Sequence, residues 1–357
     1  MKIGIFAITP AQIHFYKNIV NDLREAGHET YLLIRNYGES CQLVKELGIE
    51  HYVFSNPPNS KFGKMANFPF EILRCTAYLR SKGVEVVTGF GLYEAYTSIG
   101  LRCPSITFTD SEYTCNRLSF SIQFWLSEKF MDHIITPEKY SQDLGDKQIR
   151  VRSYKELAYL HPNYFQPDPR VFDELGIPPG EPYVILRFNA FDAVHDVGIS
   201  GFDDHQRELL VDVLKDHARV FISAEGKLND NLKKYLLPTK KCRIHDAIAF
   251  AKLLVTDTQT MATESALLGT PTIRVNSFVG SNDMSNFIEL EQDYGLIYNF
   301  NNPLAAIEQA EKLISDPSLK KDWQTKREIL LSDKDDIVEY FSRFIVDPSF
   351  RVIHEES

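Results

Sequence analysis

The segment TDTQTMATESALLGTP, residues 256–271, lies between two short apolar runs, AFAKLLV at residues 249–255 and TIRVN at residues 272–276. The first run predicts a buried strand that leads into a polar turn, and the second predicts the next strand. The small and apolar residues between them predict a helix that packs closely against a sheet. A strand, a polar turn, a helix and a second strand form half of a nucleotide-binding unit.

The polar turn has the chemistry of an anion site. Thr258, Gln259 and Thr260 supply hydroxyls, an amide and backbone N–H groups where the helix begins. Met261 follows them in the first turn. A helix N-terminus has unpaired N–H groups and a partial positive charge, so it favours a phosphate. Glu264, one turn further, is placed to bind the two hydroxyls of a ribose, or, in the alternative interpretation, only complements the helix dipole.

The length and composition are those of an ordinary globular chain with a net negative charge. Its 357 residues suggest two domains, and 43% hydrophobic residues argue against wholesale disorder. The net charge of -10 argues against nucleic acid as a partner, because no excess of Lys and Arg exists to contact phosphates. Five scattered cysteines without a C-x-x-C pair are typical of reduced thiols and provide no zinc motif.

The apolar runs give no sign of a membrane span. The opening residues MKIGIFAITP form one short strand without the basic and long apolar regions of a signal peptide. No run reaches the roughly 18 apolar residues that a span requires. We therefore expect a cytoplasmic protein whose contact with a membrane is at most peripheral.

Apolar strands and amphipathic helices alternate in two series. The first series covers residues 1–160 and predicts a parallel sheet with helices on both faces. A proline-rich linker follows at residues 161–182, and the second series covers residues 183–333, with a strand placed at residues 241–245. Residues 334–357 predict a final helix and a tail, with packing against the first domain as one arrangement. The expected fold class is α/β, with two doubly wound Rossmann-like domains that face a cleft.

Six segments resemble one known family. They are HFYKNIVNDLREAGHE at 14–29, NRL at 116–118, ITPEKY at 135–140, KELAYLHP at 155–162, DVG at 196–198 and TESALLGTP at 263–271. With them the chain resembles, over almost its whole length, the domain of unknown function 354 family, placed with the B-type glycosyltransferase superfamily.

This resemblance implies the B-type fold, a sugar nucleotide on the C-terminal domain, an acceptor on the N-terminal domain, and no metal or cofactor. The non-hydrolysing UDP-N-acetylglucosamine 2-epimerases are similar in fold and in their Glu-containing motif. Many superfamily members have glycines in the phosphate turn, whereas this chain has Thr258, Gln259 and Thr260. The details of the diphosphate contact are therefore expected to differ.

Glycosyl transfer needs a cradle for the leaving diphosphate, a cation that neutralises it and, for inversion, a base. Arg187 is near the end of the predicted strand YVILRF, and its planar fork suits two phosphate oxygens; the alternative is a salt bridge to a loop carboxylate. Lys227 is the second candidate for the cation. His195, a further catalytic candidate, lies on a loop of about 15 residues after Arg187, a length that indicates a lid or a binding role.

The first domain supplies the candidates for acid and base. His14 follows the first strand on the expected ligand side. It is a candidate base, because the histidine side chain in general titrates near neutrality; alternatively it only bonds its own loop. Asp110 and Glu112 follow a predicted strand and either divide acid and base roles or cap the next helix. The polar cluster extends toward the acceptor side with Tyr113, Asn116 and Arg117.

The sequence thus predicts a metal-independent glycosyltransferase-like enzyme that binds a nucleoside diphosphate sugar, favoured as a UDP-sugar. Its acceptor is a glycan, a lipid or a small molecule. A UDP-sugar 2-epimerase and a non-catalytic nucleotide-sugar binder are the alternatives. For SFSIQFWL, residues 119–126, core packing is favoured, with contact to a membrane-bound acceptor as the alternative. The sequence leaves the oligomeric state open.

Overall fold

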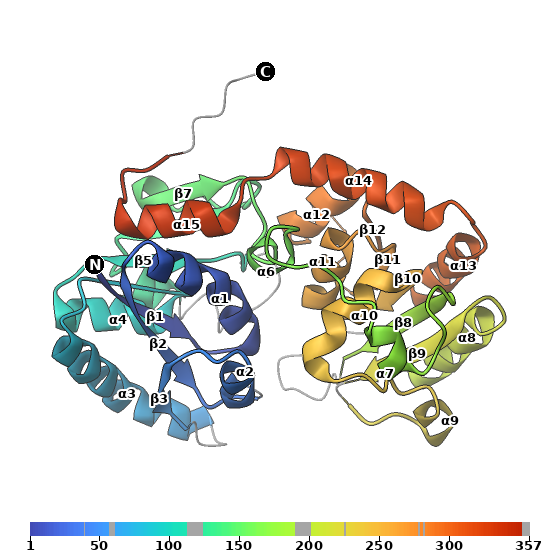
Figure 1. Cartoon of the computed structure of the whole chain (residues 1–357), viewed down its shortest axis with the longest axis horizontal. Helices are drawn as coiled ribbons and strands as arrows, with labels where there is room; N and C mark the ends of the chain where they lie inside the picture. Colours follow the sequence, from blue (N-terminus) through green and yellow to red (C-terminus); the bar gives the residue numbers. More distant parts are fainter. Residues whose placement is uncertain are drawn as a thin grey trace. The chain divides into compact units, whose positions relative to one another are not determined.

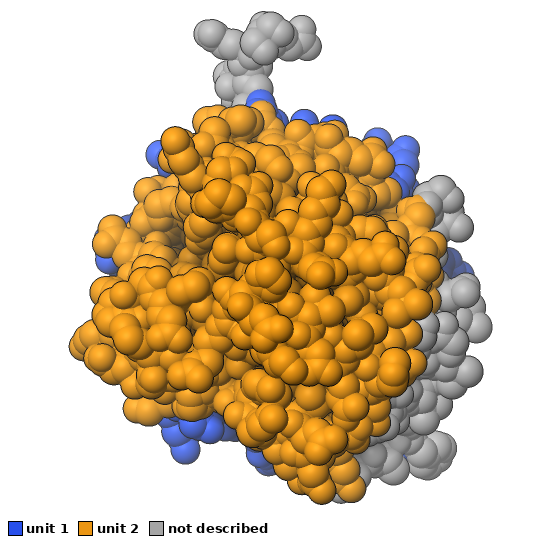
Figure 2. Space-filling view, turned by 90° about the vertical axis from the view of Figure 1, so that its right-hand side faces the viewer, with its two compact units in different colours: residues 1–159, 334–357 blue, residues 160–333 orange. Residues whose placement is uncertain are grey.

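The computed structural model of the chain describes residues 1–38, 40–56, 61–112, 124–189, 201–224, 226–277, 279–280 and 283–351. The side chains of residues 61, 62, 64 and 65 are not part of that description. The chain divides into two compact units, coloured separately in Figure 2. The first unit contains residues 1–159 and the described part of 334–357, and the second contains residues 160–333.

The first unit is built on a seven-stranded parallel sheet with the order β3-β2-β1-β4-β5-β6-β7. Its strands are β1 (Lys2–Ala7), β2 (Glu29–Arg35), β3 (His51–Ser55), β4 (Val86–Gly89), β5 (Ser105–Phe108), β6 (His133–Pro137) and β7 (Gln148–Val151). The helices of this unit are α1 (Pro10–Glu25), α2 (Ser40–Glu46), α3 (Lys61–Lys82), α4 (Leu92–Leu101) and α15 (Ile337–Val346), with the short 3-10 helix Gly145–Lys147 before β7. Helices α3 and α4 pack together, and α1 contacts both α2 and α15 (Figure 1).

The second unit has a five-stranded parallel sheet with the order β12-β11-β10-β8-β9. Its strands are β8 (Tyr183–Phe188), β9 (Arg219–Ala224), β10 (Leu253–Thr256), β11 (Thr272–Val275) and β12 (Ile297–Phe300). Its helices are α7 (Val171–Leu175), α8 (Asp204–Leu214), α9 (Asp230–Lys233), α10 (Ile244–Phe250), α11 (Gln259–Leu267), α12 (Ser285–Gln292), α13 (Pro303–Ile314) and α14 (Leu319–Asp333), with the 3-10 helix Lys241–Arg243. The short α6 (Leu157–Leu160) lies at the boundary between the units. Both sheets are parallel and carry helices between their strands, so the α/β class and the Rossmann-like organisation are confirmed.

Local sequence explains how β1 and α1 begin the first unit. The strand KIGIFA is buried apart from its first residue, as expected for a central parallel strand. Gly4 packs so closely that an added Cβ would lie 3.0 Å from Leu79 Cδ1. Thr9 caps α1 by accepting a hydrogen bond from the Gln12 N–H, and Pro10 occupies the first turn, where no N–H is needed.

Residues after Asp333 return to the first unit and cover α1. The Phe341 ring of α15 lies 5.4 Å from the Phe15 ring of α1, in an edge-to-face arrangement. The backbone of Asp335 is bound on both sides, because its N–H donates to the carbonyl of Arg152 and its carbonyl accepts from the Ser153 hydroxyl. The C-terminal helix is therefore an integral part of the first unit.

Two details differ from the sequence prediction. Residues 241–245 were expected to form a strand, but this prediction is wrong: they form a 3-10 helix and the start of α10. The helical spacing lets Arg243 pair with Asp246, three residues further on, which a strand would place on opposite faces. The edge strand β7 was not predicted, since QIRV is short and partly exposed.

Candidate functional site

Helix α11 follows the carboxyl end of β10, which is the central strand of the second sheet. The Thr258 hydroxyl bonds to the Thr256 hydroxyl at 2.8 Å, and the Thr258 N–H donates to the same Thr256 oxygen at 2.9 Å. Thr258 therefore makes no side-chain cap to the first turn of α11. Thr260 is exposed, and Gln259 and Met261 are half-buried. The N-terminus of α11 is accessible and suits an anion.

The opposite end of α11 is held by side chains from α14. Arg327 donates from Nε to the carbonyl of Leu267 at 2.7 Å. Gln324 donates from Nε2 to the carbonyls of Leu268 and Gly269, at 3.3 and 3.0 Å. A cation and an amide thus bind carbonyls at the negative end of the helix dipole. The fold fixes α11 at its C-terminus and leaves its N-terminus accessible.

Glu264 of α11 is buried and contacts a residue that the sequence analysis did not single out. Its Oε1 lies 3.0 Å from Nε2 of His245, which belongs to α10. The imidazole in turn packs edge-on toward the Phe165 ring at 6.1 Å. The carboxylate is therefore oriented by a buried histidine. No local signal identified His245, because its partner is 19 residues away and 241–245 was assigned to a strand.

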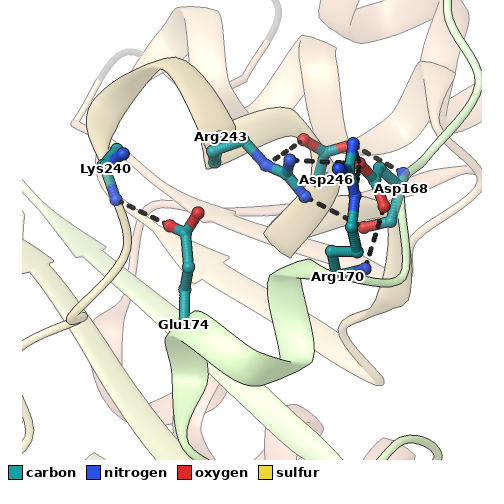
Figure 3. A network of polar contacts seen from close by, with 6 residues as sticks. All are labelled: Asp168, Arg170, Glu174, Lys240, Arg243 and Asp246. Atoms are coloured by element: carbon teal, nitrogen blue, oxygen red, sulfur yellow. Dashed lines mark hydrogen bonds and ion pairs between the residues drawn. The ribbon is translucent and has the colours of Figure 1, made fainter.

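A polar network joins the connection before β8 to α10 (Figure 3). The carboxylate of Asp246 accepts from the Asp168 N–H at 2.8 Å and pairs with Arg243 Nε at 2.9 Å. Arg170 and Arg243 both donate to Asp168, at 2.7 and 3.2 Å. The hydrogen bond from the Arg170 side chain is the main reason why the pKa of Asp168 lies well below its usual range. The network fixes the start of α10, and with it His245.

Arg187 and Asp257 lie at the carboxyl ends of the neighbouring strands β8 and β10. Arg187 Nη1 donates to the Ser223 hydroxyl of the neighbouring strand β9 at 2.8 Å. Asp257 accepts from the Asn189 N–H at 2.7 Å, and burial raises the pKa of its carboxyl to about 7. These bonds join the loop after β8 to the turn before α11. Lys227, the second predicted cation, is exposed on the loop after β9.

The candidates of the first unit are engaged in separate contacts. Asp110 forms an ion pair with Lys155, a second residue that the sequence analysis missed. Glu112 is buried, and its Oε1 accepts from the Ser141 N–H at 2.6 Å. His14, on α1, is half-buried, and its ring lies 5.3 Å from the Tyr159 ring. Asp110 thus pairs with a cation, whereas Glu112 accepts from a backbone N–H.

Glu94 is a further buried carboxyl that the sequence analysis did not select. It lies at the start of α4, beside the carboxyl ends of β4 and β5, and accepts from the Gly91 N–H and, at 3.0 Å, from the Thr107 hydroxyl. Burial raises the pKa of Glu94 to about 7. Gly91 is the N-cap of α4 and Glu94 stands three residues later, so this carboxylate makes one half of a capping box; glycine has no side chain to make the other half.

The remaining predicted site residues, His195, Tyr113, Asn116 and Arg117, lie outside the described residues. Within the described part of the chain, no helix is long and apolar enough to cross a membrane. The same part contains no group of three or more His, Cys, Asp or Glu side chains arranged to hold a metal ion.

The comparisons with known proteins agree with this architecture. The chain belongs to the family described as protein of unknown function (DUF354), whose model matches residues 1–322. No curated protein matches it.

Several solved structures share the fold of this chain at low sequence identity. The UDP-GlcNAc 2-epimerase from Neisseria meningitidis bound to UDP-GlcNAc is similar with a TM-score of 0.68 and 12% identity, over 97% of this chain and 99% of that one. The UDP-GlcNAc 2-epimerase from Methanocaldococcus jannaschii gives 0.65 and 13%, over 92% and 99%. The glycosyltransferase SsfS6 from Streptomyces sp. SF2575, complexed with thymidine diphosphate, gives 0.57 and 11%, over 96% and 99%. At these identities the likeness shows a common fold of B-type glycosyltransferases and 2-epimerases.

Proposed function

We propose that this member of the DUF354 family is an enzyme that binds a nucleoside diphosphate sugar, a UDP-sugar, on its second unit and transfers the sugar to an acceptor. No metal or cofactor is needed in this scheme. The observation that carries the proposal is the geometry of α11. Its accessible N-terminus presents backbone N–H groups to the diphosphate, and Glu264, held by His245 at 3.0 Å, accepts hydrogen bonds from the ribose hydroxyls.

The leaving diphosphate gains negative charge as the bond between the anomeric carbon and the phosphate oxygen breaks. Arg187 lies at the carboxyl end of β8, beside the strand end from which α11 begins, and is the candidate that neutralises this charge. Its register partner on β10 is Thr256, two residues before the N-cap of α11. A new bond forms between the anomeric carbon and an acceptor hydroxyl, whose proton passes to a base. His14 is the candidate for that base.

Structural neighbours support the donor class. The Neisseria meningitidis protein is bound to UDP-GlcNAc, and the Streptomyces protein is complexed with thymidine diphosphate. The first test is thermal unfolding with UDP-, GDP-, CMP- and dTDP-sugars. A ligand at about 100 times its Kd stabilises the folded state by about 2.7 kcal/mol. If none of the four classes raises Tm, the proposed donor site is refuted.

Turnover separates the enzyme from a protein that only binds. His14→Ala should leave the affinity for the nucleotide sugar unchanged and abolish release of the nucleoside diphosphate in the presence of an acceptor mixture. Asp110→Asn should act in the same direction, although its effect includes the loss of the ion pair with Lys155. Binding without any product in the wild type would identify a non-catalytic binder.

A 2-epimerase is the second candidate, because two similar structures with TM-scores of 0.65 and 0.68 are UDP-GlcNAc 2-epimerases. Such an enzyme removes the proton at C2 of the sugar and returns one to the opposite face, without an acceptor. Incubating UDP-GlcNAc alone in deuterium oxide distinguishes the two functions. Deuterium at C2 indicates an epimerase, whereas release of UDP only when an acceptor is present indicates a transferase.

A further inference from the structure

Helix α3 carries an apolar stripe on its outer face. Its inner face packs in the core through Cys75 and Leu79, which are fully buried. On the outside, Phe70 and Leu73 keep 70% and 66% of their surface exposed. The same face carries three more exposed apolar residues, and we call the whole set the α3 stripe: Ala66, Pro69, Phe70, Leu73 and Ala77. The steps of three and four residues place this set along one side of the helix.

A second exposed apolar group lies beside α3. Trp125 and Leu126 are 71% and 41% exposed. The Tyr96 hydroxyl donates to the Leu126 carbonyl at 3.2 Å, and the Tyr96 ring meets the Phe68 ring of α3 at 5.6 Å. One tyrosine thus contacts both elements, which brings the backbone of Leu126 close to α3. Large exposed aliphatic and aromatic side chains that gather in this way mark an interaction surface.

The charge of α3 is opposite to that of the whole chain. The chain has a net charge of -10, whereas α3 contains Lys61, Lys64, Arg74, Arg80 and Lys82 and a single acid, Glu71. Glu71 is buried and accepts from the Tyr93 hydroxyl at 2.6 Å, so it does not reach the surface. Arg74 and Arg80 are exposed, and each donates to a neutral backbone carbonyl; among the described residues neither forms an ion pair.

The charges beside Trp125 are balanced. Lys129 and Lys147 share a shallow hollow with Glu128 and Asp146. The cationic part of the surface is therefore α3 itself.

We propose that the α3 stripe, together with Trp125 and Leu126, docks the protein on an anionic lipid surface. An apolar stripe flanked by basic residues lies in the headgroup region with its apolar side chains below and its cations at the lipid phosphates. Trp125 adds a side chain that favours the membrane–water interface. Pairing of two α3 helices through the stripe in a symmetric dimer is disfavoured, because Arg74 and Arg80 of each copy would bring charge of the same sign into the interface. None of the residues of this surface belongs to the proposed nucleotide-sugar site.

Flotation with lipid vesicles tests the proposal directly. The full chain should float with vesicles that contain phosphatidylglycerol and should bind several-fold less to pure phosphatidylcholine. The variant Phe70→Ser/Leu73→Ser should lose at least about tenfold in vesicle affinity, because both apolar side chains leave the lipid. Each of Arg74→Gln and Arg80→Gln should lower the affinity about fivefold, and added salt should act in the same direction.

The control is Leu304→Ser/Ile329→Ser, which removes two apolar side chains that are also more than half exposed, at 51% and 58%, from α13 and α14. This control should bind vesicles like the wild type. Equal flotation of Phe70→Ser/Leu73→Ser and the wild type, or no flotation of the wild type, overturns the proposal. Light scattering tests whether a second copy of the chain occupies this surface instead. If the wild type is a dimer that does not bind vesicles, and Phe70→Ser/Leu73→Ser is a monomer, the α3 stripe is a protein interface and the proposal is wrong.

Discussion

Exchanging Glu264 for Gln or Ala tests the central contact of the proposed site. The carboxylate is buried and accepts from or pairs with His245 Nε2 at 3.0 Å. Gln has nearly the same shape, and its amide oxygen can accept from a protonated Nε2, so α10 and α11 should keep their packing. Ala removes the side chain and leaves the His245 imidazole buried without this partner. The two variants therefore separate loss of charge from loss of the whole contact.

The expected magnitudes follow from the kind of hydrogen bond that is lost. A bond between a charged group and a ribose hydroxyl contributes about 1.5 to 3 kcal/mol, and a neutral one about 0.5 to 1.5 kcal/mol. Glu264→Gln should therefore weaken UDP binding about five- to tenfold, and Glu264→Ala about 10- to 150-fold. Glu264→Ala should also lower the free energy of unfolding of the ligand-free protein by about 1 to 3 kcal/mol, because the imidazole loses a partner.

Isothermal titration calorimetry with UDP and with UDP-GlcNAc measures both effects. Because the ribose is common to both ligands, each variant should weaken the two by the same factor. Glu308→Gln, an exposed carboxylate on α13 in the same unit, is the control and should bind like the wild type. If Glu264→Gln binds UDP with wild-type affinity, or weakens only UDP-GlcNAc, Glu264 does not hold the ribose and the reasoning fails.

Three further predictions concern single residues. Burial raises the pKa of Glu94 from 4.5 to about 7, so between these pH values the folded protein keeps a proton that the unfolded chain loses. The contribution of Glu94 to the free energy of unfolding is therefore full at low pH and is lost as pH rises to and through 7. Glu94→Gln does not titrate, so urea unfolding should show that its free energy of unfolding, relative to that of the wild type, grows by about 2 to 3 kcal/mol from pH 5 to pH 8. Asp283→Ala leaves the buried guanidinium of Arg274, which Asp283 now binds with two bonds at 2.8 and 2.9 Å, without its counter-charge, and should cost about 3 to 5 kcal/mol in the same assay at constant pH. Arg187→Gln should weaken UDP more than uridine in calorimetry, by about 1.5 to 3 kcal/mol, and an equal effect on both ligands would exclude a phosphate contact.

The order of strands and helices could be predicted because its signals are local. Apolar runs of four to seven residues give the parallel strands, and Gly27 and Gly83 mark the ends of α1 and α3 through their positive φ angles of 85° and 70°. The turn before α11 was identified for the same reason. Its position between β10 and β11 follows from the hydrophobic pattern alone.

The partners of the site residues could not be predicted, because they come from distant parts of the chain. His245 contacts Glu264 from another helix, and Lys155 reaches Asp110 across 45 positions. The pattern around His245 also suited a strand, and only the network of Arg243 and Asp246 with Asp168 shows why a helix begins there. Such tertiary contacts override local propensity, which is weak over five residues.

The polarity of α11 explains why one short helix can serve as the proposed binding element. A helix of nine residues is not stable on its own, so its position must come from packing. Gln324 and Arg327 bind carbonyls at its C-terminal end, and its own residues Ala262 and Ala266 are fully buried. These contacts are complete without a ligand. None of them uses the N–H groups of the first turn, so those groups are oriented before an anion arrives, and binding does not have to order the helix.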